Sequence, residues 1–441
     1  MSRILQRKLT ETSEVALSGE GIRLHLAGGR TVIDGSGGAA VACIGHGNRR
    51  VAAAMAEQAG RMAYAHTGFF TSEPAEALAD LLLGDEPGGL THAFFVSSGS
   101  EAMEAAVKLA RQYFIELGQP QRTRIIGRRQ GYHGTTLGAL SVGGHVARRA
   151  PYEPLLSAAF SKVSPCFAYH FQAPEESDAD YVVRLAAELE TEFQRLGPDT
   201  VAAFCAETVV GATTGCVAAV PGYFAAMRAV CDRHGALLVL DEVMCGMGRT
   251  GTVHAWEQEG VAPDIQAVAK GLGGGYAPVG GILVAGRIIA ALRAGSGGFM
   301  HGQTYQAHPV ACAAALEVQR IVGEQGLVQA AARQGAGLAA RLVERFGNHR
   351  HVGDIRGRGL FHALEFVEDR GTRAPFETGR GVAEAVKQAA LDRGLAIYPC
   401  TGTVDGVRGD HVIVAPPYTV SDGELDEIVD RLGAAVDVVF A

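Results

Sequence analysis

The chain has 441 residues, of which 47% are hydrophobic and 20% are charged, and its formal net charge is −8 at pH 7. This length and composition are typical of a globular protein with two or more lobes, not of a disordered chain. The excess of acidic residues disfavours nucleic acid as a partner. Because no apolar run reaches the roughly 18 residues of a membrane helix, no membrane association is expected.

The eight cysteines are scattered along the chain, and no two of them form a CxxC pair. This spacing disfavours a zinc site, so we expect reduced thiols and no bound metal. The first residues read MSRILQRKLTETSE, which is charged and lacks the apolar segment of a secretory signal. These features together predict a cytoplasmic protein.

Expected strands and helices alternate through most of the chain. Short apolar runs predict strands at 92–96, 124–127, 201–207, 236–242 and 281–285. Stretches of helical periodicity predict helices at 101–114 and 222–235. This alternation predicts an α/β fold with a mostly parallel sheet flanked by helices on both faces. Ligands of such sheets bind beyond the carboxyl ends of the strands.

The pattern changes near residue 325, where a long helical stretch is followed by strand-like runs and a further helix. This change predicts a smaller α+β domain, to which strands within 22–45 are expected to contribute. Both chain ends would then form the small domain. We divide the chain into an N-terminal part of the small domain, a large domain and a C-terminal part of the small domain, at 1–60, 61–324 and 325–441.

The first candidate motif, SSGSE, joins a predicted strand to a predicted helix through Ser97, Ser98, Gly99 and Ser100. We expect Ser100 to cap the helix. The free N–H groups at a helix start attract an anion, and small residues allow a phosphate group to approach. Taken alone, the motif fits an ordinary strand–turn–helix without a ligand equally well.

The second motif is GYHGTTLGA at 131–139. Tyr132 offers an aromatic face to a flat ligand, although a core position explains a single tyrosine as well. His133 fits a ligand contact and a structural histidine equally.

The third motif, LLVLDEV, places Asp241 at the end of an apolar strand. A carboxylate buried there needs a partner, and a protonated pyridine nitrogen would serve. A structural ion pair is the alternative. A magnesium site for a nucleotide is disfavoured, because no phosphate-binding lysine motif accompanies Asp241.

The fourth candidate is Lys270, which ends the run IQAVA and precedes GLGGG. Desolvation at such a place lowers the pKa of a lysine and makes its amine a usable nucleophile or base. The four other lysines lie on an amphipathic helix or in polar surroundings. The interval from Asp241 leaves room for a helix and a strand, so both side chains fit on one edge of the sheet. A structural lysine that reaches solvent is the alternative.

The last candidate segment, HGQTYQAHP at 301–309, suits a second phosphate contact or a subunit boundary. Together the motifs supply a phosphate cradle, an aromatic platform, a carboxylate and a lysine. A pyridoxal phosphate enzyme needs these parts.

The same motifs resemble those of the class III (ω-) aminotransferases of the aspartate aminotransferase fold, from about residue 20 to the C-terminus. The matching segments read SSGSEAMEAAVKLAR, GYHGTTLGA, AETVVGATTG, LDEVMCGMGRTG, AVAKGLGGGYAPVGG, HGQTYQAHPVACAAAL, IRGRGLF and VAPPY. The resemblance implies a large domain with a seven-stranded sheet, pyridoxal 5′-phosphate as the cofactor, and a homodimer with its active sites at the interface.

The resemblance also implies roles for single residues. Lys270 would bind the cofactor as a Schiff base, and Asp241 would pair with the pyridinium nitrogen. Glu207 would lie near the ring edge, and in relatives it can pair with a mobile arginine. The remaining cofactor contacts would come from the phosphate-binding Ser98, Gly99 and Ser100, from Thr304 of the neighbouring subunit, from Tyr132 and Val243 on the two ring faces, and from His133.

Departures from relatives bear on the substrate. Thr135 stands where enzymes for γ-aminobutyrate and ornithine often carry arginine. Ala40 stands where amine–pyruvate enzymes often carry tryptophan, so a bulkier substituent of the substrate would fit beside Ala40. Phe69 and Phe70 would line a pocket across the interface. Arg408 would bind a substrate carboxylate and swing away for an uncharged group. A solvated loop arginine is an equal alternative for Arg408.

These features favour an aminotransferase that moves an amino group from an amine or ω-amino acid to a 2-oxo acid, pyruvate in the first place, by a ping-pong mechanism. The alternative is an amino acid racemase, an epimerase or an ammonia-lyase on the same fold with the same cofactor. A non-catalytic protein is disfavoured by the intact Lys270 and Asp241. A nicotinamide dehydrogenase is disfavoured because Tyr276 stands where GxGxxG requires glycine.

Overall fold

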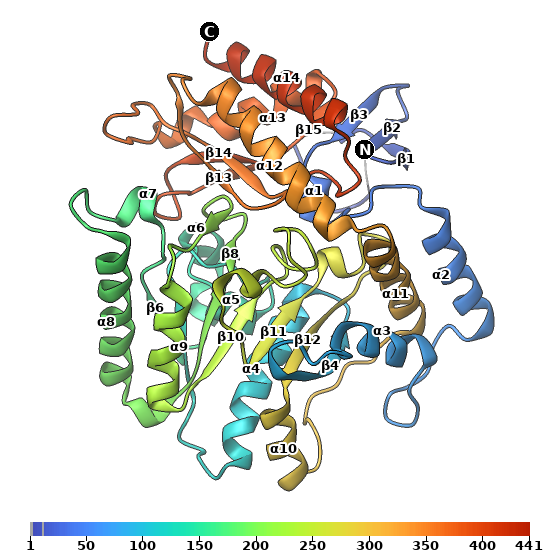
Figure 1. Ribbon diagram of the computed structural model, residues 1–441, viewed down its shortest axis with the longest axis vertical. Helices are drawn as coiled ribbons and strands as arrows, with labels where there is room; N and C mark the ends of the chain where they lie inside the picture. Colours follow the sequence, from blue (N-terminus) through green and yellow to red (C-terminus); the bar gives the residue numbers. More distant parts are fainter. Residues whose placement is uncertain (1–2, 11–12) are drawn as a thin grey trace.

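The computed structural model describes residues 3–10 and 13–441. A large central sheet with its helices occupies the lower part of the view in Figure 1, and the elements of both chain ends lie together above it. The site described below lies where these two parts meet.

The central sheet has seven strands and confirms the predicted mostly parallel arrangement. In spatial order the strands are β4 (Leu90–Val96), β12 (Gly280–Ala285), β11 (Ile265–Val268), β10 (Leu237–Asp241), β7 (Val201–Glu207), β5 (Arg124–Arg128) and β6 (Phe160–Val163). Only β12 runs antiparallel to its neighbours β4 and β11. The other six strands therefore point their carboxyl ends to one edge, where the ligands of such sheets bind.

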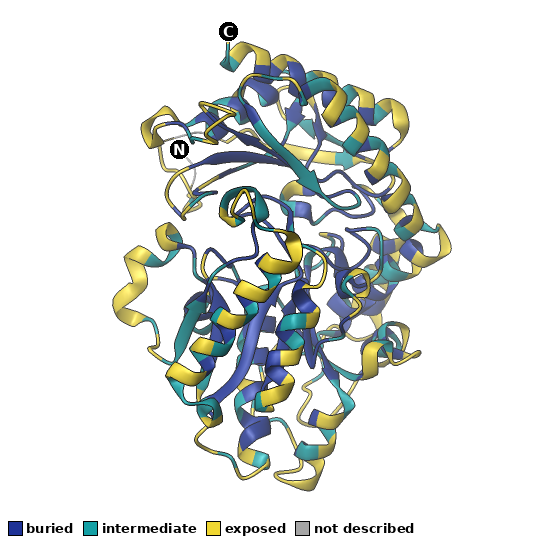
Figure 2. Cartoon of the chain, turned by 60° about the vertical axis from the view of Figure 1, so that its left-hand side comes forward, coloured by how far each residue is buried: buried dark blue, intermediate teal, exposed yellow. Residues whose placement is uncertain are grey.

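The strands of this sheet are mostly apolar along their length, and successive side chains alternate between the two faces, so both faces are apolar. On β7, Phe204 packs into one hydrophobic cluster while Ala203 and Cys205 pack into the other. The helices that supply these clusters bury one face against the sheet and expose the other to solvent (Figure 2). They are α3 (Glu73–Leu83), α4 (Gly99–Glu116), α5 (Leu137–Val142), α7 (Ala168–Phe171), α8 (Asp178–Leu196), α9 (Tyr223–His234), α10 (Gly286–Ala294) and α11 (Pro309–Glu324). The short helix α6 (Val146–Arg149) contributes no buried residue.

The chain ends form two four-stranded sheets that share a separate apolar core with the C-terminal helices. One sheet joins β1 (Ala16–Glu20), β2 (Arg23–Leu26), β3 (Thr31–Asp34) and β15 (Leu395–Ala396), and the other joins β13 (Val352–Gly357), β14 (His362–Phe366), β17 (Asp410–Val414) and β16 (Tyr398–Thr401). The helices are α1 (Gly37–Ala40), α12 (Leu327–Phe346), α13 (Val382–Asp392) and α14 (Asp422–Val439). N-terminal strands thus pair with a C-terminal strand, as expected.

Two elements differ from the sequence-based predictions, helix α2 and the segment between β10 and β11. Helix α2 (Arg49–Arg61) packs against α11, so it extends from the chain-end part to the central part. The segment between β10 and β11 contains no α-helix but only the short 3₁₀ helix η4 (Ala255–Glu259). The domain boundaries at 60 and 324 stay a prediction. Among the residues described, no helix is both long and apolar enough to cross a membrane.

Candidate active site

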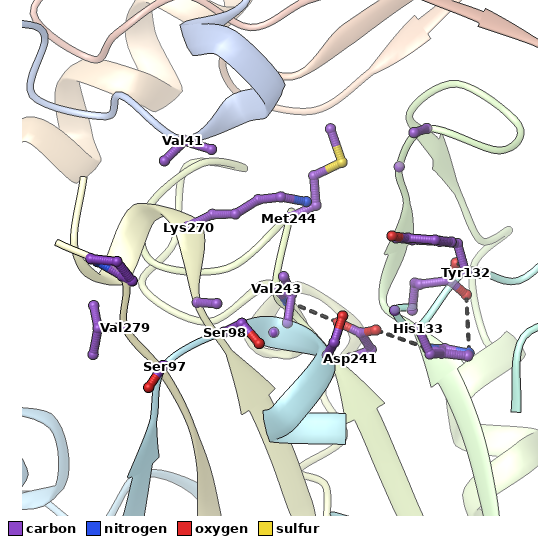
Figure 3. Close-up of a pocket in the computed structure, with 18 of the residues that line it drawn as sticks. Val41, Ser97, Ser98, Tyr132, His133, Asp241, Val243, Met244, Lys270 and Val279 are labelled. Atoms are coloured by element: carbon purple, nitrogen blue, oxygen red, sulfur yellow. Dashed lines mark hydrogen bonds and ion pairs between the residues drawn. The ribbon is translucent and has the colours of Figure 1, made fainter. Parts of the chain in front are cut away.

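A cavity of about 300 Å³ opens at the carboxyl edge of the seven-stranded sheet. Loops that follow β4, β5, β7, β10 and β11 form its walls, and the segment after α1 closes it from the chain-end side (Figure 3). Much of the wall is apolar and includes Val41, Val209, Met244, Ala277, Pro278 and Val279. The wall also carries polar side chains, and the positions of these side chains determine what the cavity can bind.

Lys270 stands two residues beyond the end of β11, and its side chain extends across the cavity (Figure 3). Its φ is 46°, a left-handed conformation that costs a non-glycine residue about 1–3 kcal/mol. Gly274 and Gly275 follow with φ of 57° and 87°, so the chain turns sharply behind the lysine. Burial lowers the pKa of Lys270, although the nearby Asp241 carboxylate opposes that effect. The lysine amine is therefore easier to deprotonate than an exposed one.

Asp241 and Glu207 end neighbouring parallel strands and face each other in the sheet register. The ring of His133 lies between them: Nδ1 is 2.8 Å from Asp241 Oδ2, and Nε2 is 3.9 Å from Glu207 Oε2. The other oxygen of Asp241 accepts a hydrogen bond of 2.9 Å from the amide of Val243. The position of the Asp241 carboxylate is thereby fixed from two sides.

Glu207 forms a buried ion pair with Arg128, the last residue of β5. The guanidinium donates to Glu207 Oε2 at 3.1 Å and to the Glu207 carbonyl at 2.6 Å, and the amide of Tyr132 donates to Oε1 at 2.8 Å. Burial alone would raise the pKa of Glu207, but His133, Arg128 and the Tyr132 amide together hold it below its ordinary value. The partner of Glu207 in this structure is thus the buried Arg128.

The phosphate-cradle motif lies at the start of α4, as predicted, but the capping residue differs. Ser98 is the N-cap, because its extended backbone lets its side chain accept a hydrogen bond of 3.2 Å from the amide of Glu101. The expectation that Ser100 caps the helix is wrong. Ser100 already lies in the first turn, and its Oγ accepts a hydrogen bond of 3.0 Å from the amide of Thr135. Ser98, Gly99 and Ser100 all line the cavity.

Close packing around α4 explains the glycine at its first position. A Cβ atom on Gly99 would lie 2.7 Å from Cγ1 of Val243, nearer than such atoms approach. Val243 and Tyr132 both line the cavity, from the loops after β10 and β5. The predicted cofactor contacts of this chain therefore surround one space.

Five predicted residues are not part of this cavity wall. Phe69 and Phe70 are 80% and 67% exposed, and Thr304 is also exposed. Arg408 is exposed, and its Nε donates to Asp405 Oδ2 at 2.7 Å. Ala40 is buried beside the cavity-lining Val41, with a φ of 60°. Their predicted roles stay predictions.

The statement that the lysines other than Lys270 lie in polar surroundings is wrong for Lys162. Burial, and after it the charge of Arg149, lowers the pKa of Lys162 to about 7. Its Nζ donates to the carbonyls of Ser141 at 2.8 Å and Ser161 at 3.2 Å. A cation donating to carbonyls at a helix C-terminus explains this lysine, which lies outside the cavity-lining set.

A family model described as "Aminotransferase class-III" matches residues 6–436. The chain belongs to the class III aminotransferases. An uncharacterised aminotransferase of Schizosaccharomyces pombe is 50% identical to it over 96% of this chain and 92% of that protein. Family membership implies pyridoxal phosphate as the cofactor.

Two solved structures share the whole fold with this aminotransferase. An (S)-enantioselective ω-transaminase from Thermomicrobium roseum has a TM-score of 0.92 and 38% identity, and the match covers 98% of this chain and 94% of that one. An amine transaminase from an uncultivated Pseudomonas species, in its PLP-bound form, has a TM-score of 0.92 and 34% identity, with 99% and 98% covered.

The close approach of Gly99 to Val243 predicts the effect of one added methyl group. Gly99→Ala should lower the free energy of unfolding by about 1–3 kcal/mol, because β-branched Val243 has few ways to move aside. Gly323→Ala is the control: it lies in α11 with nothing within 4 Å of the added atom, so stability should stay equal or rise. Thermal and urea unfolding measure both.

In a Val243→Ala background the steric conflict is absent. Gly99→Ala should then lose most of its effect. An unchanged loss in that background would show that Val243 is not the cause.

The buried ion pair predicts a large effect for Arg128→Met. Removing the cation leaves the Glu207 carboxylate buried without it, which costs about 3–5 kcal/mol of stability at neutral pH. Arg129→Met is the matched control, because Arg129 pairs with Glu188 at the surface and should cost at most about 1 kcal/mol.

The pH dependence of this effect has a defined sign. Arg128 lowers the pKa of Glu207 in the folded state, so its stabilisation is present above the ordinary glutamate pKa of about 4.3 and fades at lower pH. The difference in unfolding free energy between wild type and Arg128→Met should therefore shrink towards acid pH. A difference that grew there would contradict the assignment.

Proposed function

We propose that this class III aminotransferase moves an amino group from an amine or ω-amino acid to a 2-oxo acid, with pyruvate as the acceptor, by a ping-pong route. The observation that carries the proposal is the meeting of Lys270 and the Asp241–His133 pair in one cavity at the carboxyl edge of the sheet. A lysine with a lowered pKa and a fixed carboxylate are the groups that amino transfer needs.

The cavity fits pyridoxal 5′-phosphate by its shape and its donor set. The start of the 18-residue helix α4, with only small side chains from Ser97 to Ser100, is a site for a phosphate dianion. The buried carboxylate of Asp241 suits a protonated pyridine nitrogen. Lys270 would hold the aldehyde carbon. When bound, the cofactor supplies a conjugated ring that accepts the electron pair left on the amine-bearing carbon.

The residues of the chain have separate tasks in this proposal. Asp241, held by His133 and the Val243 amide, keeps a proton on the ring nitrogen. Once released from the cofactor, Lys270 Nζ would take the proton from the amine-bearing carbon of the substrate and would deliver it to the former aldehyde carbon of the cofactor. The apolar walls exclude water, which strengthens the attraction between Asp241 and the ring nitrogen.

We also propose that two copies of the chain form a homodimer. Phe69 and Phe70 are adjacent, largely exposed and apolar, which a covering partner would explain. Thr304, exposed here, would then reach the phosphate in the partner subunit.

The direct test is a single half-reaction. Protein loaded with pyridoxal phosphate is mixed with an amine in the absence of oxo acid, and its visible absorption is followed. We expect one carbonyl product per site with loss of the original band, and pyruvate should restore that band. Lys270→Ala should abolish the transfer, whereas Lys387→Ala, a lysine paired with Glu384 on α13, should not.

Two results would contradict the proposal. Racemisation of a chiral amine without loss of the band would indicate a racemase. Release of ammonia without an oxo acid would indicate a lyase.

A further inference from the structure

Arg148 is an unpaired cation that packs on Tyr132, a residue of the cavity wall. It lies on the short helix α6, and its guanidinium carbon is 4.6 Å from the centre of the Tyr132 ring. The side chain is half-buried, yet it forms no hydrogen bond or ion pair with any residue of 3–10 or 13–441. A guanidinium held against an aromatic ring, with its N–H groups free of protein acceptors, can bind an anion that a ligand supplies.

Two other arginines, one next to it in the sequence and one next to the cavity, are paired with acceptors. Arg149, the next residue, donates to the carbonyls of Leu140, Ser141 and Gly143 at 2.6–3.0 Å. Arg128 is paired with Glu207. Stacking on Tyr132 leaves the N–H edge of the Arg148 guanidinium available, and a planar guanidinium can bind a carboxylate through two parallel hydrogen bonds.

The charge of Arg148 acts on the interior of the cavity. The pKa of Lys270 is lowered first by burial, and Arg148 adds to that lowering. Burial raises the pKa of Tyr132, and the charges of Arg148 and Arg7 both act against that rise. Arg148 is the strongest of the charges that act on Tyr132, whereas Tyr398 and Asp241 act in the opposite direction.

Arg408 is a weaker candidate for the same task in this structure. Its guanidinium and the backbone amides of Val407 and Arg408 all bond the carboxylate of Asp405, so its charge is already compensated. The cavity wall itself is mostly apolar, and its two carboxylates are engaged by His133 and Arg128. Arg148 thus acts on Lys270 and has no anion among residues 3–10 and 13–441.

We propose that Arg148 binds the carboxylate of the 2-oxo acid substrate and thereby selects acids over uncharged carbonyl compounds. This inference rests on the proposed function and names the residue that recognises the acceptor. Tyr132 would hold the guanidinium in place by stacking, while Lys270 acts on the carbon next to the bound carboxylate.

The test compares acceptors with and without a carboxylate. Protein loaded with pyridoxamine phosphate is mixed with pyruvate or with butanal, for wild type, Arg148→Met and Arg148→Lys. Loss of a charge-assisted hydrogen-bond pair should lower kcat/KM for pyruvate roughly tenfold to hundredfold in Arg148→Met. Butanal should change by less than about twofold, and Arg148→Lys should recover part of the pyruvate activity because it keeps the charge.

Arg129→Met, at the surface in a pair with Glu188, is the matched control and should leave the ratio of pyruvate to butanal unchanged. An equal fall for both acceptors in Arg148→Met would show that the arginine only supports Tyr132. A selective fall in Arg408→Met, with none in Arg148→Met, would overturn the assignment as well.

A binding measurement separates this inference from the proposed function. Propionate carries a carboxylate but neither an amine nor a ketone, and calorimetry measures its Kd for protein loaded with pyridoxal phosphate. Arg148→Met should weaken propionate binding at least tenfold, and an unchanged Kd would overturn the inference. If wild type transferred an amino group to neither acceptor, the proposed function would fail, while the propionate result would still decide the role of Arg148.

Discussion

The parallel pairing of β7, β10 and β11 is the constraint on which the site depends. Because these strands point the same way, Glu207, Asp241 and Lys270 lie at one edge of the sheet, although they are far apart in the sequence. The register sets Glu207 beside Asp241, and a strained turn carries Lys270 over both. A slip of one residue would turn these side chains to the opposite face.

Charge balance follows from that arrangement. Arg128, Glu207, His133 and Asp241 contact one another in that order along the edge of the sheet, so no carboxylate of the set is buried without a partner. Lys270, in contrast, has a lowered pKa because it lacks water and lies near Arg148. The same surroundings that keep an amine available at Lys270 leave Arg148 ready for an anion.

The sequence predicted the sheet, and it pointed to residues that line one cavity, because both depend on local patterns. Apolar runs ending in Asp241 or just before Lys270 indicate strand ends without reference to the rest of the chain. The features that the sequence did not predict depend on backbone conformation or on contacts between distant segments. Ser98 caps α4 in place of Ser100 because of a backbone conformation that the SSGS run does not reveal. The burial of Lys162 and the contact of Arg148 with Tyr132 arise from packing between distant turns, which periodicity cannot show.

The central claim is that Lys270 is the residue that holds the cofactor. Protein loaded with pyridoxal phosphate can be reduced with borohydride, digested and mapped by mass spectrometry. The account predicts a pyridoxyl group on Lys270 alone, with Lys162 unmodified although burial lowers its pKa too. A label on Lys162, or an unlabelled Lys270, would contradict the account.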